Sequence, residues 1–363
     1  MAKKDILEEL RSKLGDSPEE NAAFLKKETE RFIKEGNAEG IEAAGTLILE
    51  NMPQNQKDEI QRLTQLDGKP LNEAYGEIVK LINDKKIVEA KPLAEKLYKK
   101  IITDYPQTEN SKFVSLRNPF EDNFYQLKFK PEQVLNRTPF DFAEYITSYA
   151  YILVETGSPL DAIPVLEKAI EYNPVDCGPY FELAEIYKLL KNKRQVIETT
   201  KKTLELASSP VAIARCYANM GYILTDMGEY DDAAAYYTAS VIFAPHPMVP
   251  YEMQALANKK GSPIVRPERE QIVEVMKKYG MEFGPDPDVV SVCAQLSVHY
   301  LTEKDIPNAL QAMKMTYNLT RDEKVKELIL KYDPNAERLV PNQTPVEDGG
   351  KPNITQTVNE ELK

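Results

Sequence analysis

Small residues recur along the second half of the chain at one fixed distance before a second small or apolar residue, and this recurrence constrains the fold more than any other feature. The small residues precede these anchors by twelve positions each time. They are Ala150, Ala184, Gly221 and Ser297, and the anchors are Ala162, Val196, Ala233 and Ala309. Small side chains let two antiparallel helices approach closely while larger neighbours interlock around them. The pattern therefore predicts repeated helix pairs, which must stack because no single pair can bury its apolar face alone.

Larger residues and turns accompany each of these positions. Four residues after the anchors stand Leu166, Thr200, Tyr237 and Met313. Turns between the two helices of a unit are predicted at Gly157-Ser158, Lys191-Asn192 and Gly228-Glu229. The first two anchors are 34 residues apart, and this unit resembles the tetratricopeptide repeat (TPR), which has the same length and the same order of slots. The resemblance implies an all-α fold, a TPR-like α-solenoid of antiparallel helix pairs.

The resemblance also divides the chain into units. Three repeats are expected over 143–247, at 143–176, 177–210 and 214–247, and a fourth over 290–323. The interval of 76 residues between the last two anchors requires a degenerate repeat over 248–289, with helical stretches near 250–259 and 267–279. A capping helix is expected over 324–337, and residues 1–105 form an N-terminal helical region with degenerate TPR-like units at about 22–55 and 75–108.

Two segments break the helical pattern. Residues 106–142 lose helical periodicity, and eight aromatic residues crowd into 105–142, so we expect an irregular aromatic-rich insert. Exposing so many aromatics would create a large apolar patch, which predicts that the insert is ordered and packs against the repeats at the mouth of their groove. Whether it is a fixed cap or a lid that a partner displaces stays open. Residues 338–363 are polar and rich in proline and glycine, which predicts a disordered tail.

Composition excludes several classes of partner. The net charge of −12 argues against nucleic acid, because phosphate contacts require clustered lysine and arginine. No apolar run approaches the roughly 18 residues that a membrane helix requires, and no signal segment begins the chain. The three cysteines, Cys177, Cys216 and Cys293, are widely spaced and form no disulfide or zinc pattern. We therefore expect a cytoplasmic protein that binds neither nucleic acid nor membrane.

No catalytic constellation is found in the sequence. The two histidines, His246 and His299, are far apart and are more typical of structural or exposed residues than of a metal pair. Nucleotide-binding, nucleophile-elbow and zinc-protease motifs are missing. We expect no enzyme activity, no cofactor and no metal.

The TPR resemblance places a binding surface on the first helix of each unit, along a concave groove. The expected partner-binding residues are Glu144, Thr147, Tyr151, Phe181, Glu185, Arg215, Asn219, Tyr222 and Gln295. Mixed aromatic and polar groups of this kind suit a protein or peptide partner, although Tyr151 and Tyr222 could equally pad the groove wall. A clamp for an acidic C-terminus is not expected, because only Arg215 and Asn219 have the right side chains.

The predicted function is thus a protein- or peptide-binding scaffold or adaptor. Two alternatives stay open: a peptide-sensing bacterial regulator, and a purely structural protein that self-associates as a homo-oligomer.

Overall fold

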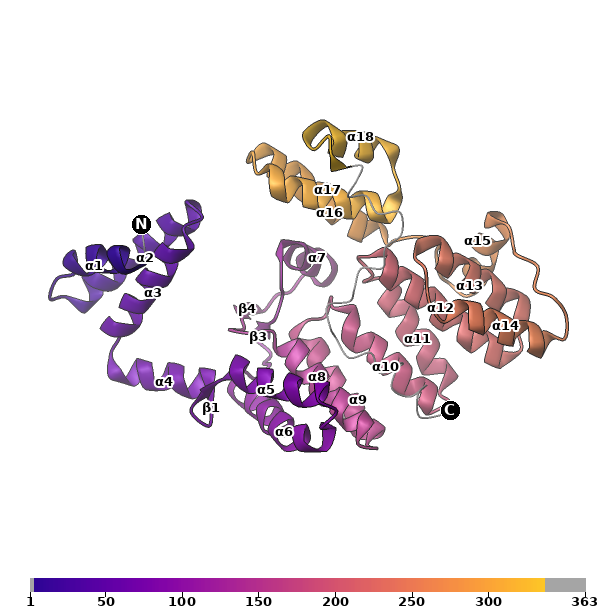
Figure 1. The fold of residues 1–363 in the computed structure, drawn as a ribbon, viewed down its shortest axis with the longest axis horizontal. Coiled ribbons are helices and arrows are strands. Elements are labelled where there is room, and N and C mark those ends of the chain that lie inside the picture. The colour runs from indigo at the N-terminus through magenta and orange to yellow at the C-terminus, as the bar shows by residue number, and fades with distance from the viewer. Residues whose placement is uncertain (1–2, 337–363) are drawn as a thin grey trace. The chain divides into compact units, whose positions relative to one another are not determined.

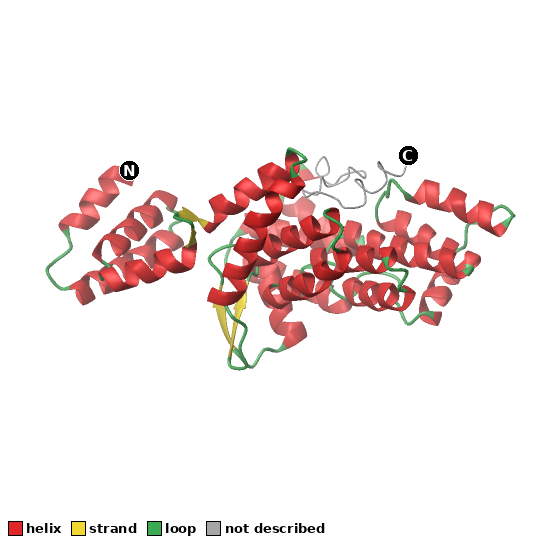
Figure 2. Cartoon of the chain, turned by 90° about the horizontal axis from the view of Figure 1, so that it is seen from below, coloured by secondary structure: helices red, strands yellow, loops and turns green. Residues whose placement is uncertain are grey.

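The structure is a computed structural model that describes residues 3–336. Two compact units divide the chain, Met1–Glu73 and Ala74–Lys363, and each is described by itself. Helices supply nearly all of the regular structure in the described part (Figures 1 and 2). No helix within residues 3–336 combines the length and apolarity needed to cross a bilayer. The predicted tail, 338–363, lies outside the described residues.

Unit one is built from four helices and a short hairpin. These elements are α1 (Lys3–Ser12), α2 (Pro18–Lys34), α3 (Ala38–Asn51), α4 (Gln54–Thr64), β1 (Gln65–Leu66) and β2 (Lys69–Pro70). The Ser17 side chain accepts a hydrogen bond from the Glu20 backbone N–H, which caps the start of α2. Helix α3 packs against both α1 and α2. Its Gly40 lies directly against the Phe32 ring, so the two helices approach more closely there than any side chain would allow.

Unit two contains most of α5 (Leu71–Asn83) and all later elements. Before the clear repeats come α6 (Ile87–Asp104), β3 (Ser111–Val114), α7 (Pro119–Phe129) and β4 (Val134–Arg137). The repeats begin with α8 (Phe142–Glu155), α9 (Pro159–Tyr172), α10 (Cys177–Leu189), α11 (Lys193–Leu204), α12 (Pro210–Met227) and α13 (Tyr230–Phe243). They are followed by α14 (Val249–Lys260), α15 (Arg269–Lys278), α16 (Pro287–Thr302), α17 (Ile306–Thr320) and α18 (Glu323–Tyr332).

Consecutive helices form the packing units of this part of the chain. The most extensive contacts join α8 with α9, α10 with α11, α12 with α13, and α16 with α17 (Figure 1). The predicted small residues and anchors are all buried: Ala150, Ala184, Gly221, Ser297, Ala162, Val196, Ala233 and Ala309. A Cβ at Gly221 would lie 2.8 Å from the Tyr237 ring, so this slot admits only glycine at the present helix separation. The all-α fold of stacked antiparallel pairs is confirmed.

The turns within the pairs require left-handed backbone. Gly157 and Gly228 have φ of 81° and 83°, a region that glycine adopts without a steric penalty. Lys191 and Lys304 take the same position in their own pairs at φ of 54° and 61°. Each turn reverses the chain within a few residues and thereby sets the second helix against the first.

Helices α14 and α15 depart from the expected degenerate repeat. Both helices form close to the predicted stretches, yet each packs on α13 and not extensively on the other. The connection between them includes Gly261, at φ of 72°, and the exposed Val265. The buried residues of these helices, Leu256 of α14 with Ile272 and Met276 of α15, belong to the same core cluster as those of α13.

The insert 106–142 is more regular than the sequence suggested. Strands β3 and β4 pair in parallel, with Ser111 opposite Val134, and α7 forms the crossover between them. Aromatic residues of the segment lie in the core, including Phe120, Phe124 and Tyr125. The expectation of an irregular segment is wrong here, because the Asn118 side chain accepts from the Glu121 N–H and starts a helix that the local loss of periodicity had hidden.

The insert is held at the turns between repeats. The Ser115 N–H donates to the carbonyl of Tyr172 at 2.7 Å, where α9 ends. Asn173 donates its side-chain amide to the Ser115 carbonyl and to the Glu121 carboxylate, at 3.1 and 2.9 Å. Lys128 lies 3.5 Å from Asp286, the residue that caps α16. These contacts show that the insert packs on the repeats along the inter-repeat turns, whereas its place at the mouth of the groove and its role as cap or lid stay predictions.

Candidate functional site

The predicted binding residues lie on the first helices of their pairs, on α8, α10, α12 and α16, and they differ widely in exposure. Glu144, Thr147, Glu185 and Arg215 are half-buried. Tyr151, Phe181 and Asn219 are buried, with exposed fractions of 7%, 6% and 4%. Tyr222 is 40% exposed, and Gln295 is also exposed.

Helices α10 and α12 bring five of these residues into one polar cluster. The Arg215 guanidinium of α12 lies over the Phe181 ring of α10, 4.3 Å from its centroid. Lys188, one turn beyond Glu185 on α10, bonds to the Glu185 carboxylate at 2.9 Å. The same ammonium donates to Asn219 Oδ1 at 2.7 Å. We call the group of Phe181, Glu182, Glu185, Lys188, Arg215, Asn219 and Tyr222 the α10–α12 cluster.

Two other predicted residues, Thr147 and Gln295, form hydrogen bonds within their own helices. The Thr147 hydroxyl donates to the Ala143 carbonyl at 2.7 Å on α8. The Gln295 amide donates to the Ser291 hydroxyl at 3.0 Å on α16. Within residues 3–336, neither side chain has a hydrogen bond to the α10–α12 cluster. Their role in binding stays a prediction.

Glu182 belongs to the cluster although the sequence did not single it out as a binding residue. Its carboxylate lies 3.8 Å from the Arg215 guanidinium, with a side-chain exposed fraction of 15%. Glu182 is one residue after Phe181 and three before Glu185, so helical spacing places it between the two predicted positions. That spacing was the only signal for it in the sequence.

Three buried side-chain atoms of the cluster have no hydrogen-bond partner within the described chain. They are Glu182 Oε2, Arg215 Nη2 and Asn219 Nδ2. Arg215 is too far for a hydrogen bond to Glu182 or Glu185, at 3.8 and 4.0 Å. The Lys188 ammonium can only donate, so it fixes the Asn219 amide with its oxygen toward Lys188 and its NH₂ group away. The cluster therefore presents one acceptor and two donors.

Burial also changes the acid–base behaviour of the cluster. Desolvation raises the pKa of Glu182 to about 7, since the Arg215 charge offsets only part of the burial penalty and Glu185 adds repulsion. His246 follows α13, and burial together with the charges of Arg215 and Lys188 lowers its pKa. Its Nδ1 accepts a hydrogen bond from the Met248 N–H at 3.3 Å. Near neutral pH the cluster thus changes charge through Glu182.

The arrangement suits hydrogen bonding more than group transfer. Within the described residues, no three histidine, cysteine or acidic side chains are placed to hold a metal ion. Burial raises the pKa of the Cys216 and Cys293 thiols, so neither is activated as a thiolate. What the cluster offers a ligand is a set of buried donors and acceptors flanked by Phe181 and Tyr222.

Comparison with known proteins gives one family. The sequence profile of the tetratricopeptide repeat matches residues 214–245, which cover most of α12 and all of α13. A crystal structure of a tetratricopeptide repeat protein from Parabacteroides merdae is similar at 14% sequence identity and a TM-score of 0.36. That likeness covers 86% of this chain and 99% of the other. No curated protein sequence matches the chain.

Proposed function

Because this chain is a tetratricopeptide-repeat protein, we propose that it is a scaffold that binds a peptide segment of a partner protein at the α10–α12 cluster. Repeats of this family generally mediate protein interactions and are typically not catalytic. The family does not say which residues bind or what chemistry they recognise. The proposal for this chain therefore rests on its own side chains.

One observation carries the proposal: the three unpartnered atoms Glu182 Oε2, Arg215 Nη2 and Asn219 Nδ2. Buried polar atoms in folded proteins almost always have partners, and an unpartnered one costs about 1–3 kcal/mol. A peptide amide carries a donor N–H and an acceptor C=O side by side. Bound across α10 and α12, a peptide would donate to Glu182 and accept from Arg215 and Asn219.

The side chains around these atoms support peptide recognition. Lys188 bridges Glu185 and Asn219, and its ammonium lies 5.0 Å from the centroid of the Tyr222 ring. Arg215 is stacked on Phe181. Groups held in this way lose little freedom on binding, so more of the interaction energy appears as affinity. Arginine and tyrosine are also the residues that most often dominate binding energy at protein interfaces.

A selection from a random peptide library, displayed on phage, tests the proposal on the full chain. Peptides enriched on the full chain are synthesised with a fluorophore, and their affinities are measured by anisotropy. Asn219→Asp keeps the oxygen that accepts from Lys188 and removes the NH₂ donor. Glu182→Gln keeps the shape and changes the acceptor. Each variant should weaken the selected peptides about tenfold, the loss that follows when one buried hydrogen bond is removed.

The matched control is Asn123→Asp on α7. Asn123 is exposed, and its amide donates to the Pro119 carbonyl within its own helix. This variant should bind the selected peptides like the parent. Unchanged affinity in both cluster variants would show that ordered water satisfies the three atoms, and the proposal would then be wrong. Size-exclusion chromatography of the same variants covers the self-association alternative, since a second copy on this cluster would dissociate in Asn219→Asp.

A further inference from the structure

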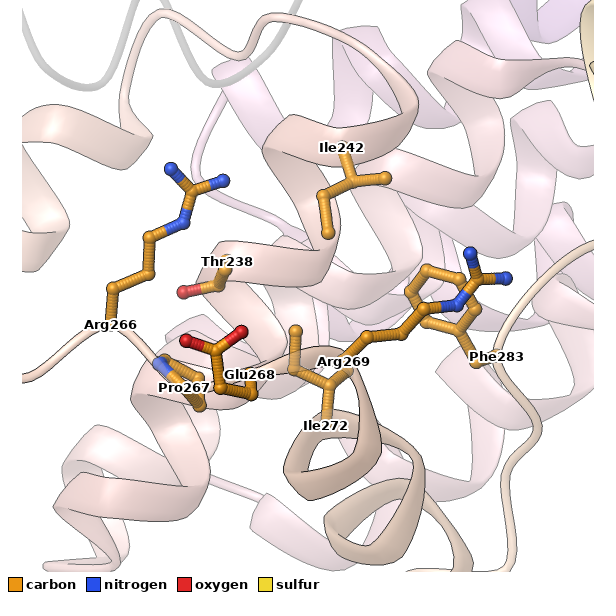
Figure 3. A pocket seen from close by; sticks show the side chains of 8 residues that line it. All are labelled: Thr238, Ile242, Arg266, Pro267, Glu268, Arg269, Ile272 and Phe283. Carbon is orange, nitrogen blue, oxygen red and sulfur yellow. The ribbon is translucent and has the colours of Figure 1, made fainter.

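A second candidate site lies away from the α10–α12 cluster, between α13 and α15. It is a pocket of ≈ 410 Å³ (Figure 3). That volume is within the range of small-molecule sites, roughly 300–1,000 Å³. Its walls are formed by Thr238, Ile242, Arg266, Pro267, Glu268, Arg269, Ile272 and Phe283.

The pocket follows from the unusual packing of α14 and α15. Because α15 packs on α13 and not extensively on α14, the connection between them passes beside α13 and contributes Arg266 and Pro267 to the wall. The α10–α12 cluster uses the first helices of two pairs, whereas this pocket uses α13, the second helix of its pair. None of its residues belongs to the cluster, so the two sites can be tested separately.

Two arginines on the pocket wall have no carboxylate within 4 Å among residues 3–336. These are Arg266 and Arg269, and both are exposed. Most other described arginines have such a neighbour, for example Arg194, which lies 2.7 Å from Glu198. The Arg269 guanidinium lies 5.1 Å from the centroid of the Phe283 ring. Both guanidiniums therefore keep hydrogen-bond donors free for an anion.

The hydroxyl of a largely buried threonine also faces the pocket. Thr238 is 5% exposed and lines the wall, and Figure 3 shows its oxygen on the side of Arg266 and Glu268. Buried threonines on neighbouring helices donate to the carbonyl one turn earlier, as Thr203 does to Thr199 and Thr225 to Gly221. Thr238 has no hydrogen bond to any described residue. The Thr238 oxygen is not among the buried atoms without a partner, so it is accessible from the pocket, and a ligand that bonds to it displaces no bond to the chain.

The rest of the wall is apolar and carries one acid. Ile242 is 47% exposed and forms an apolar surface with the half-buried Phe283 beside the arginines, whereas Ile272 on the same wall is 1% exposed. Glu268 is the N-cap of α15, and its backbone N–H donates to Gln271 Oε1 at 2.9 Å. The Glu268 carboxylate reduces the positive charge that the two arginines create. The wall thus favours an anion of single charge over a dianion.

We propose that this pocket binds a small carboxylate that carries an aromatic or branched apolar group. The carboxylate oxygens accept from the Arg266 and Arg269 guanidiniums and from the Thr238 hydroxyl. The apolar group lies on Ile242 and Phe283. A phosphate monoester is disfavoured because its second negative charge meets Glu268.

Calorimetric titration of the full chain with N-acetylphenylalanine tests this proposal. We expect saturable binding with a Kd on the order of a millimolar, which is typical for a ligand of this size. N-acetylphenylalaninamide, which has the same ring and no charge, should bind at least about tenfold more weakly, since charge-assisted bonds are the stronger ones. Phenyl phosphate at pH 8 should also bind more weakly than the carboxylate.

Three variants locate the binding. Arg266→Gln with Arg269→Gln removes both cations and should abolish detectable binding, and Thr238→Val removes the hydroxyl at nearly constant volume and should weaken binding about threefold to tenfold. The control Arg194→Gln removes an exposed arginine on α11 and should leave the titration unchanged.

Three results with the parent protein would overturn the proposal. The amide could bind as tightly as N-acetylphenylalanine, or phenyl phosphate could bind more tightly than it. N-acetylphenylalanine could also show no saturable binding at about ten times the expected Kd, on the order of 10 mM. A parent-like titration of the double variant would also overturn the proposal.

Discussion

The two sides of α12 both contain buried atoms, yet they differ in how those atoms are partnered. Toward α13 the helix presents Gly221 and Leu224, and the Tyr237 ring fills the space above Gly221. Toward α10 it presents Arg215 and Asn219, each with a buried nitrogen that has no partner in the described chain. The first side stabilises the fold through close packing. The second carries an uncompensated penalty that a bound ligand could remove.

Burial by itself therefore does not tell a structural residue from a functional one in this protein. Asn219 is 4% exposed, as deeply buried as many core residues, but its side-chain nitrogen Nδ2 has no hydrogen-bond acceptor among the described residues. Three predictions test whether the two sides of α12 differ as described, in order of expected effect.

The largest difference in stability is expected between variants of two tyrosines, one on each side of α12. Tyr237→Ala removes a ring that is 1% exposed and should lower the free energy of unfolding by about 3–5 kcal/mol, the usual loss for a buried aromatic. Tyr222→Ala removes a ring that is 40% exposed on the cluster side and should lower it by less than about 1 kcal/mol. Urea denaturation measures both. Equal losses would show that the cluster side is ordinary core.

The next effect concerns the closeness of α12 and α13. Gly221→Leu should lower the free energy of unfolding by about 3 kcal/mol, because its Cβ alone would come within 2.8 Å of Tyr237. Gly76→Leu is the matched control, since Gly76 is an exposed helical glycine on α5 with nothing within 4 Å of its Cβ position. That control should raise stability by a few tenths to about 1 kcal/mol, as glycine is the poorer helix former. A parent-like melting curve for Gly221→Leu would mean that the repeat register is wrong.

The smallest effect is electrostatic and depends on pH. Burial raises the pKa of Glu182 from its ordinary value of 4.5 to about 7, so the folded state favours the protonated form. The unfolded state releases this proton at lower pH, and the contribution of Glu182 to stability is therefore lost as pH rises from about 4.5 through about 7. Glu182→Gln removes this loss and should be more stable than the parent by about 1–3 kcal/mol at pH 8, with little difference at pH 4.

Glu198→Gln is the control for the pH experiment, since Glu198 is 49% exposed and paired with Arg194 on α11. Its difference from the parent should stay within about 0.5 kcal/mol at both pH values. Urea denaturation at pH 4 and pH 8 gives the comparison directly. A Glu182→Gln variant that is less stable than the parent at pH 8 would contradict the raised pKa and show that the pair with Arg215 stabilises the fold.

The insert shows where reasoning from sequence reaches its limit within a single segment. Its order followed from the density of aromatics, and Phe124 and Tyr125 are indeed buried in the main core. Its secondary structure did not follow, because α7 also carries the exposed apolar residues Leu127 and Phe129, so its buried face does not stand out as a single apolar stripe. The packing of α14 and α15 was hidden for a related reason. Each helix forms close to the residues predicted for it, but no local pattern shows that both helices pack on α13 and not extensively on each other.

The sequence by itself determined the helix pairs of this protein, because small residues such as Ala184 and Gly221, set at fixed distances from their anchors, allow only one close approach between neighbouring helices. It also determined that Phe181, Glu185, Arg215 and Asn219 lie on first helices, since helical periodicity fixes the side on which a residue stands. Only the tertiary structure decided that Glu182 belongs to the same cluster and that Lys188 donates a hydrogen bond to the side-chain oxygen of Asn219. It also decided that three buried polar atoms of the cluster have no hydrogen-bond partner in the described chain. Hydrogen bonds between α10 and α12 depend on distances of a few tenths of an ångström between residues about 30 positions apart. No local pattern encodes such distances.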